Sequence, residues 1–374
     1  MRSSRGSASA SDVPAVRSVR RILIACWPRR PVIAGLAACA TAGALCQTLG
    51  TPLPWMIGPL LAMALLRFSG ADVTVPLGGR EAGQIIIATA LGLYFTPVVA
   101  REVLGRWELL IAAALFATAL AYIGAIPISR LTDTDRTTAF FASVPGGATE
   151  MAILGERFGA KPDRIALAQS MRILLVVVLV PFAFTFVGVH GSDVFTLVGK
   201  HVAAQGLAIL FACTAAGGFL VSRLKLPNAW LLGALAVSVG ITASGLEWSA
   251  VPTPLSNAGQ LLLGCALGSR FEREFMRRAP KFALVVCVST LAAIGLSAIF
   301  GAVIARASGL AVPTMILATA PGGIAEMCIT AKVLQLGVPM VTAAHVTRVI
   351  MLVTTAAPTF RLVQQALRAA RRDA

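Results

Sequence analysis

The sequence predicts an all-α polytopic membrane protein made of two homologous repeats, with about 10–12 membrane segments. Three observations support this fold class. Only 13% of the 374 residues are charged and 57% are hydrophobic, whereas about 25% of the residues of a soluble domain are charged. Apolar stretches near the length of about 20 residues that crosses a bilayer recur along the chain. Distinctive residues of the first half also return in the second half at a constant spacing.

Apolar stretches make up most of the chain, and the mean hydropathy is +0.82. The first half contains the stretches 32–47, 55–68, 84–96, 109–128 and 165–189. The second half contains the stretches 202–221, 230–245, 255–268, 282–305 and 339–360. Those at 55–68, 84–96 and 255–268 are short for a membrane crossing, so we expect them to be tilted, extended at their ends or partly buried.

A constant offset in the numbering relates the two halves. The motif Pro-Gly-Gly-x-x-Glu-Met at 145–151 returns at 321–327, and the surrounding residues 142–153 match 318–329 at most positions. With a shift of one residue, "PLPWMIG" at 52–58 matches "PNAWLLG" at 227–233. A single offset that runs through so many distinctive residues indicates a duplicated unit.

The duplication and the composition together predict the domain organisation. We expect membrane repeat 1 at 31–190 and membrane repeat 2 at 201–365. The Ser/Arg-rich residues 1–30 are typical of a disordered basic tail, and 366–374 form a second basic tail.

The distribution of positive charge indicates that the second repeat is inverted relative to the first. If each repeat crosses the membrane five times and its Pro-Gly-Gly segment enters without crossing, 25 of the 32 Lys and Arg residues lie on the inner side. Six crossings in each repeat would leave 17 there. Because inner loops are rich in Lys and Arg, the sequence predicts the inverted arrangement, with both termini inside.

Proline and glycine interrupt both repeats at equivalent places, Pro145-Gly146-Gly147 and Pro321-Gly322-Gly323. Proline removes a backbone donor, and each glycine costs about 1 kcal/mol in a helix. Freed backbone groups are tolerated at membrane depth only where protein or a water-filled cavity surrounds them. We therefore expect a helix break at each motif, beside a cavity into which the following half-helix directs its N–H groups and its positive dipole end.

A glutamate stands one turn into each predicted half-helix, and an arginine follows at the same spacing in both repeats: Glu150 with Arg172, and Glu326 with Arg348. A carboxylate at membrane depth costs about 2.5–3.5 kcal/mol on insertion scales, so it indicates function by default. In one interpretation the glutamates bind a proton or cation while the arginines hold an anionic group. In the other, a Glu–Arg pair fixes helix packing. The two are compatible.

Two further pairs of equivalent residues admit two interpretations each. Gln84 and Gln260 present their amides either to the cavity or to a neighbouring helix. Gln169 and His345 lie just before the two arginines, at equivalent positions. A hydrogen-bonded core histidine is favoured over a proton carrier at position 345.

Composition and motifs exclude several function classes. The formal net charge of +16 suggests nucleic acid, but the arginines lie in short clusters between apolar segments, as the positive-inside rule predicts. No nucleophile elbow, phosphate loop or dinucleotide fingerprint is present in the sequence. The three histidines lack metal-ligand spacing, and the seven cysteines form no C-x-x-C pair. We therefore predict no enzyme activity, no cofactor and no metal.

The duplicated Pro-Gly-Gly-x-x-Glu-Met motif with its downstream arginine, together with "PLPWMIGPLLA" at 52–62, resembles the AbrB family of bacterial inner-membrane proteins. The likeness extends from about residue 34 to residue 360. Members of that family have been labelled ammonia monooxygenases or regulators of gene expression, and the residues above explain neither label. The resemblance implies a two-repeat domain in a bacterial inner membrane. By weaker analogy it implies kinship with transporters whose inverted repeats contain broken helices.

These observations predict a secondary transporter or exporter of a small solute, with its site between the two helix breaks near the middle of the membrane. The predicted binding residues are Gly146, Gly147, Glu150, Arg172, Gly322, Gly323, Glu326, Arg348, Gln84 and Gln260, beside the helix-breaking Pro145 and Pro321. The alternative is a membrane-embedded regulator or sensor that acts through a partner. The expected partners are the lipid bilayer and an unidentified solute or ion, without nucleic acid, and assembly into a homo-oligomer is left open.

Overall fold

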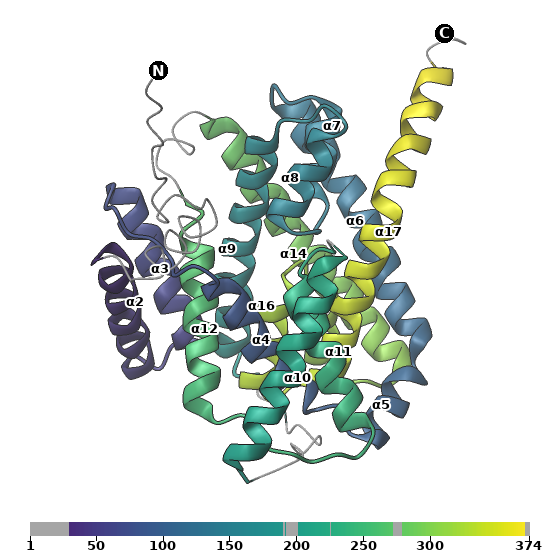
Figure 1. Ribbon diagram of the computed structural model, residues 1–374. Helices are drawn as coiled ribbons and strands as arrows, with labels where there is room; N and C mark the ends of the chain where they lie inside the picture. Colours follow the sequence, from purple (N-terminus) through teal and green to yellow (C-terminus); the bar gives the residue numbers. More distant parts are fainter. Residues whose placement is uncertain (1–29, 190, 192–200, 225, 272–278, 371–374) are drawn as a thin grey trace, which may run out of the picture.

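The structure is a computed structural model that describes residues 30–189, 191, 201–224, 226–271 and 279–370. This described part of the chain consists of helices and their connections and contains no strand (Figure 1). The predicted tail at 1–30 lies outside the described residues except for Arg30. The predicted tail at 366–374 is described as far as Ala370, the last residue of a helix.

The bounds of the helices follow the repeat. In the first half they are α2 (Arg30–Thr48), α3 (Pro54–Ser69), α4 (Gly79–Gly92), α5 (Pro97–Leu104), α6 (Trp107–Leu131), α7 (Arg136–Ser143), α8 (Ala148–Glu156) and α9 (Pro162–Phe186). In the second half they are α10 (Ala204–Arg223), α11 (Ala229–Ala243), α12 (Thr253–Gly268), α14 (Pro280–Ser308), α15 (Val312–Thr319), α16 (Ile324–Val333) and α17 (Val338–Ala370). The offset between the two motifs also relates the first residues of α15, α16 and α17 to those of α7, α8 and α9.

Within the described ranges, six helices are long and apolar enough to cross a membrane: α2, α6, α9, α10, α14 and α17. Helices α4 and α5 pass the same test only as a pair, bent by 93°. Helices α3 and α11 are apolar but shorter. These features confirm the predicted all-α membrane fold, whereas the number of 10–12 membrane segments, the division into two repeats and the inverted orientation of the second stay predictions.

The stretch 84–96, which the sequence predicts as one membrane segment, contains the bend between α4 and α5. Helix α4 ends at Gly92 and α5 begins at Pro97, which suits the first position of a helix because its missing N–H has no partner to lose there. Thr96 caps α5 by accepting a hydrogen bond from the backbone N of Val99 at 3.3 Å. The chain therefore starts a new helix in a new direction instead of extending the first.

The helices pack as two groups. Helices α2, α3 and α4 pack with α10, α11 and α12, and helices α6 to α9 pack with α14 to α17. Figure 1 shows α2 and α3 at one side of the molecule and α6 and α17 at the other. Helices α4 and α12 cross at two equivalent glycines, since a Cβ on Gly83 would lie 2.9 Å from the carbonyl oxygen of Gly259. Small residues allow membrane helices to approach this closely. The interrupted helices belong to the second group, and α16 reaches α4 of the first.

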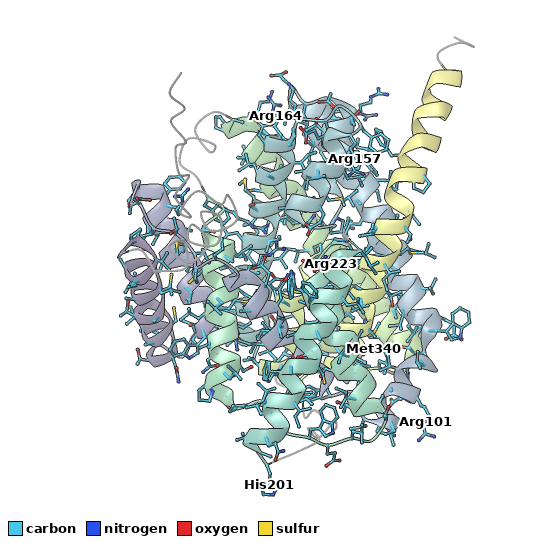
Figure 2. All side chains as sticks on the ribbon, viewed as in Figure 1. Arg101, Arg157, Arg164, His201, Arg223 and Met340 are labelled. Carbon is cyan, nitrogen blue, oxygen red and sulfur yellow. The ribbon has the colours of Figure 1, made fainter. Side chains whose placement is uncertain are left out.

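Basic residues mark the two ends of the bundle. Figure 2 shows Arg157 and Arg164 at one end and Arg101 and His201 at the other. The charge pattern of the sequence assigns Arg157 and Arg164 to the inner side of a membrane and Arg101 to the outer side. The two groups lie at opposite ends of the bundle, and which end faces the cytoplasm stays a prediction.

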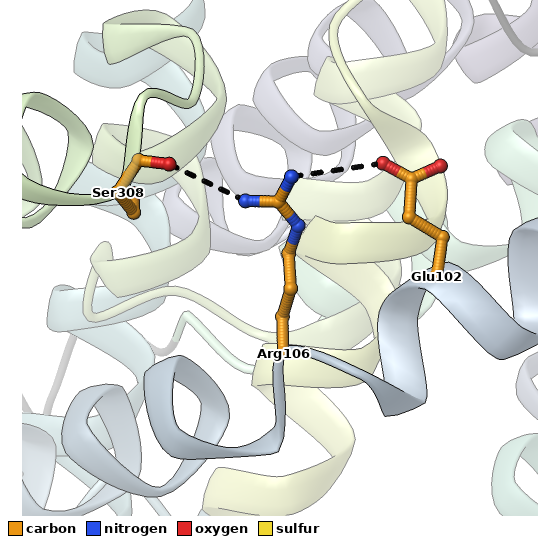
Figure 3. A network of polar contacts seen from close by, with 3 residues as sticks. All are labelled: Glu102, Arg106 and Ser308. Carbon is orange, nitrogen blue, oxygen red and sulfur yellow. Dashed lines mark hydrogen bonds and ion pairs between the residues drawn. The ribbon is translucent and has the colours of Figure 1, made fainter.

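A surface cluster ties the α5–α6 turn to the end of α14 (Figure 3). Nη2 of Arg106 lies 4.0 Å from Oε1 of Glu102, and Nη1 of Arg106 donates to the carbonyl oxygen of Ser308 at 3.4 Å. Because the side chains of the ion pair are 35% and 48% exposed, it contributes about 0–1 kcal/mol to stability. Its effect is to position the turn.

Candidate functional site

Both Pro-Gly-Gly motifs lie between two helices. Residues 144–147 separate α7 from α8, and residues 320–323 separate α15 from α16. Gly147 precedes α8 and Gly323 precedes α16, so neither half-helix has a side-chain cap. The first N–H groups of both half-helices are therefore available to a ligand and form the positive end of a helix dipole.

The two arginines bind the backbone at the ends of the first half-helices. Arg348 donates from Nη1 to the carbonyl oxygen of Ala320 at 2.7 Å and from Nη2 to that of Gly322. Arg172 donates from Nη1 to the carbonyl oxygen of Ser143 at 3.5 Å. Both arginines are buried. A cation at this place satisfies carbonyl groups that the end of a helix leaves free.

These bonds correct the hypothesis of a Glu–Arg pair. In the described ranges, Glu150 and Glu326 form no ion pair with Arg172 or Arg348, whereas the pair of Arg106 and Glu102 lies on the surface. The reason is the interruption of the helices, which places unpaired carbonyl oxygens closer to the guanidinium groups than either carboxylate. Packing at the breaks is thus fixed by arginine and backbone.

Gln169 and His345 support the same carbonyl group in the two halves. Nε2 of Gln169 donates to the carbonyl oxygen of Phe141 at 3.0 Å and to that of Val144 at 2.6 Å. Nε2 of His345 lies 2.9 Å from the carbonyl oxygen of Leu317, the equivalent of Phe141 in the second repeat. Because a carbonyl oxygen only accepts, Nε2 of His345 bears the hydrogen. The histidine is a fully buried, hydrogen-bonded core residue, as the sequence favours.

The two breaks meet at a cavity of about 80 Å³ that lies between the two helix groups. We call it the arginine cavity. One water molecule needs about 10–15 Å³ of such space, so the cavity holds several. Its polar side chains are Arg80, Gln84, Arg172, Asn228, Arg270, Glu326 and Arg348. The sequence-predicted residues that the structure brings together here are Gln84, Pro145, Gly147, Arg172, Gly322, Gly323, Glu326 and Arg348.

Four residues predicted for the site do not line the arginine cavity. Gly146 is covered by the side chain of Met151, which a Cβ at Gly146 would overlap. Gln260 is buried and does not line the cavity, so of the two glutamines Gln84 alone presents its side chain there. Pro321 lines a second cavity. Glu150 is not part of the lining, but its carboxylate accepts a hydrogen bond from the backbone N of Asn228, which is.

The arginine cavity is strongly positive, because four arginines and one glutamate line it. Arg80 and Arg270 are the two that the sequence analysis missed, since it assigned them to inner loops. The sequence feature that could have indicated Arg80 is its spacing from Gln84. The two residues are one helical turn apart on α4 and so lie on one face of the helix. A cleft lined by one sign of charge concentrates oppositely charged solutes. The uncapped N-termini of α8 and α16 add to the same field.

The two glutamates lie against the glycines that open their own helices. A Cβ on Gly147 would overlap the carboxylate of Glu150, and a Cβ on Gly323 would overlap that of Glu326. Each carboxylate thereby approaches the free N–H groups at the start of its helix, as the third residue of a capping box does. The absence of a side chain at the glycine is what makes room for it. This geometry explains why the glycine and the glutamate recur together at a fixed spacing.

Asn228 connects the site residues of three helices, and the sequence analysis did not identify it. Its Oδ1 accepts hydrogen bonds from Nη2 of Arg80 and Nε2 of Gln84, both at 3.3 Å. Its backbone N donates to Oε1 of Glu150 at 3.4 Å, while Oε2 of Glu150 is buried without a hydrogen-bond partner. Asn228 has a φ of 51°, a left-handed conformation that asparagine tolerates better than most residues. The signal in the sequence is the polar residue of "PNAW" where the first repeat has "PLPW".

Comparison with known proteins extends over nearly the whole chain. The family model described as "Transition state regulatory protein AbrB" matches residues 19–364. The uncharacterized protein YhjN of Bacillus subtilis (strain 168) is 26% identical over 357 residues, which are 88% of this chain and 92% of that protein. A candidate regulator named AbrB from Escherichia coli (strain K12) is 21% identical over 285 residues, 75% of this chain and 81% of that protein.

Proposed function

The chain belongs to the AbrB family, and from that premise we propose that it is a secondary transporter of a small anionic solute across a bacterial inner membrane, with both termini in the cytoplasm. The observation that supports this most is the arginine cavity, at which two interrupted helices from the two halves of the chain meet. Interrupted helices in corresponding positions of two repeats surround the substrate site in many secondary transporters. Their free N–H groups and the four arginines favour an anion.

The solute is held between the two helix groups. Helices α4, α11 and α12 supply one wall of the cavity, and α8, α9, α16 and α17 supply the other. Movement of one group against the other would expose the cavity first to one side of the membrane and then to the opposite side. Substrate sites at the interface between such groups permit alternating access without a permanent pore.

Glu326 provides a means of coupling. Its carboxylate lines the cavity among the four arginines and competes with an anionic solute for their charge. Protonation of Glu326 removes one negative charge and so favours binding of the anion. By linkage, the bound anion favours protonation to the same extent. A proton suits this cavity better than a sodium ion, because a metal cation would have to bind among several positive charges.

Proteoliposomes test the transport proposal. Uptake of inorganic phosphate, sulfate and methanesulfonate would be measured with and without an acidic exterior. We expect an acidic exterior to drive uptake of an anion from this set. Glu326→Gln should abolish the pH dependence of uptake. The double variant Arg80→Gln with Arg270→Gln should abolish uptake itself. Glu102→Gln, on the exposed surface of α5, is the control that retains both. Unchanged pH dependence in both Glu150→Gln and Glu326→Gln would refute the coupling, and uptake no greater than in empty liposomes would refute transport.

A regulator that acts through a partner is the second candidate, because the Escherichia coli relative is described as a regulator. Helix α17 contains 33 residues, and at 1.5 Å per residue it is about 50 Å long, well beyond the hydrocarbon core of about 30 Å. Figure 1 shows its C-terminal end projecting from the bundle, where a partner could bind. If deletion of 361–374 or of 1–20 abolished an effect on gene expression and no variant of the protein transported an anion, this candidate would replace transport.

A further inference from the structure

A second cavity adjoins the arginine cavity and has the opposite character. Its volume is about 50 Å³, and it lies between α6 and α14 beside the ends of α7 and α15. Apolar side chains dominate its lining, among them Leu120 and Ala121 of α6 and Val286 and Ala293 of α14. We call it the apolar cavity.

Three of the four hydroxyl groups that line the apolar cavity are already engaged, and that of Ser289 is the exception. Those of Ser143, Thr290 and Thr319 each donate to a carbonyl oxygen of their own helix, at 2.8, 2.8 and 2.9 Å. A hydroxyl that donates within its helix offers little to a polar ligand and leaves the wall mainly apolar. Water gains little in such a space, whereas a hydrocarbon group gains from leaving water.

The two cavities meet at Arg172. Arg172 and Pro145 line both of them. The guanidinium makes one long bond, of 3.5 Å to Ser143, and its Nε is buried without a hydrogen-bond partner. Arg172 is 8% exposed, so this free donor is a buried polar group at the junction of a positive space and an apolar space. A buried donor without a partner is costly unless a ligand supplies one.

We propose that the solute is an amphiphilic anion, whose charged head group occupies the arginine cavity and whose short hydrocarbon part occupies the apolar cavity. This inference rests on the proposed function, since it names the class of molecule that the same site takes. A purely inorganic anion would fill the positive space and leave the apolar space empty. Two kinds of molecule combine an anionic head group with a hydrocarbon part: a free organic acid and an anionic lipid of the bilayer. We assign the site to the free acid.

Alkylsulfonates provide the test, because the sulfonate remains ionised throughout and the chain alone varies. The full chain in nanodiscs of phosphatidylcholine would be titrated with methanesulfonate, butanesulfonate and hexanesulfonate by calorimetry. Burial of each added methylene strengthens binding about fourfold, so we expect the affinity to rise by that factor per carbon until the apolar cavity is full. Equal affinity for the three sulfonates would overturn the proposal.

Variants that fill the apolar cavity separate binding from partition into lipid. Ala121→Leu and Ala293→Leu reach the cavity from different helices, and both are expected to remove the gain with chain length. Ala119→Leu, on the exposed face of α6, is the matched control and keeps the gain. A gain that persists in both filled variants would overturn the proposal. Loss of hexanesulfonate binding when phosphatidylglycerol replaces part of the phosphatidylcholine would assign the site to a lipid and overturn it as well.

The outcomes for the ligand class and for transport are distinct. Binding that depends on chain length, without flux in proteoliposomes, would support the amphiphilic anion and refute the transporter. Flux of methanesulfonate with no preference for longer chains would support the transporter and refute the amphiphilic anion.

Discussion

The two helix breaks share one sequence motif but differ in the side chains that hold them. At the second break Arg348 donates two hydrogen bonds, one of 2.7 Å to Ala320 and one to Gly322. At the first break Arg172 makes one bond, of 3.5 Å to Ser143, and Gln169 makes shorter ones, of 3.0 Å to Phe141 and 2.6 Å to Val144. Because N–H···O bonds are strongest near 2.9 Å and weak beyond about 3.2 Å, the arginine is the main support of the second break and Gln169 is the main support of the first.

The two breaks also differ in the backbone conformation of their last glycine and in the place of the glutamate that follows. Gly147 has a φ of 95°, which glycine adopts more readily than any other residue, whereas Gly323 has a φ of −78°, which any residue adopts. Glu326 lines the arginine cavity, while Glu150 is in contact with the backbone of Asn228. The comparison teaches that one motif is held by different side chains in the two halves, by Arg348 at the second break and mainly by Gln169 at the first.

The difference originates outside the motif, in the residues that face it. Asn228 and Leu53 occupy matching places before α11 and α3, and both have a positive φ, of 51° and 48°. Leu53 is fully buried among apolar side chains, whereas Asn228 binds Arg80 and Gln84. The polar side chain therefore links α4 of the first repeat to the start of α11, while the backbone N of the same residue reaches Glu150 of α8.

The largest expected effect separates the two arginines. Arg348→Gln removes the donors of two buried carbonyl groups, and each such group costs about 1–3 kcal/mol when unpaired. We expect the free energy of unfolding to fall by about 3 kcal/mol for Arg348→Gln and by about 1 kcal/mol for Arg172→Gln. Thermal unfolding in one detergent measures both, and Arg223→Gln, at the exposed end of α10, is the control. Equal losses for the two arginines would show that the breaks are held alike.

The second effect concerns the two glycines. Gly147→Ala forces a residue with a side chain into a conformation essentially reserved for glycine, and we expect a loss of about 2 kcal/mol. In Gly323→Ala the backbone is unstrained, and the cost is the displacement of the Glu326 carboxylate from the start of α16, so we expect a smaller loss of about 1 kcal/mol. The same unfolding measurement applies. A greater loss for Gly323→Ala would reverse the comparison.

The third effect tests the source of the difference. Asn228→Leu gives the second repeat the residue of the first and removes the acceptor of two hydrogen bonds of 3.3 Å. We expect a loss of about 1–2 kcal/mol in stability and weaker binding of methanesulfonate, because Arg80 is no longer held at the cavity. Asn228→Gly, which keeps the left-handed conformation but not the oxygen, should weaken binding equally. Unchanged binding in both variants would remove Asn228 from the site.

The helices and the two interruptions were predictable because they depend on composition, on proline and on glycine, which act locally. The equivalence of Gln169 and His345 was likewise predictable from the constant offset in numbering between the two halves. The residues that were missed required information from neighbouring helices. Arg80 and Arg270 fit the positive-inside rule as loop residues, and the one sequence feature that links either of them to the cavity is the one-turn spacing of Arg80 from Gln84. The alternative interpretation of a Glu–Arg pair is not met because a constant spacing along the chain says nothing of backbone carbonyl groups left free by a break.

The smallest expected effect lies at the start of the first half-helices, outside the membrane-spanning helices. The carboxylate of Asp135 caps α7 by accepting hydrogen bonds from N and Oγ1 of Thr138 at 2.8 and 2.6 Å. The equivalent residue of the second repeat, Ala311, gives α15 no such cap. Desolvation raises the pKa of Asp135, but the hydrogen bonds from Thr138 outweigh it and hold that pKa below its usual range.

Because the pKa of Asp135 is depressed in the folded state, its cap stabilises the protein above the unfolded-state pKa of about 3.9, and this stability is lost as the pH falls through the folded-state pKa. We expect Asp135→Ala to cost about 1 kcal/mol at neutral pH. On acidification, hydrogen-exchange protection should fall at 136–143 and not at 312–319. Asp135→Asn retains a capping oxygen that does not titrate, so it should abolish the acid sensitivity. Equal loss of protection in both segments would place the acid-sensitive group elsewhere and leave the two breaks alike in this respect.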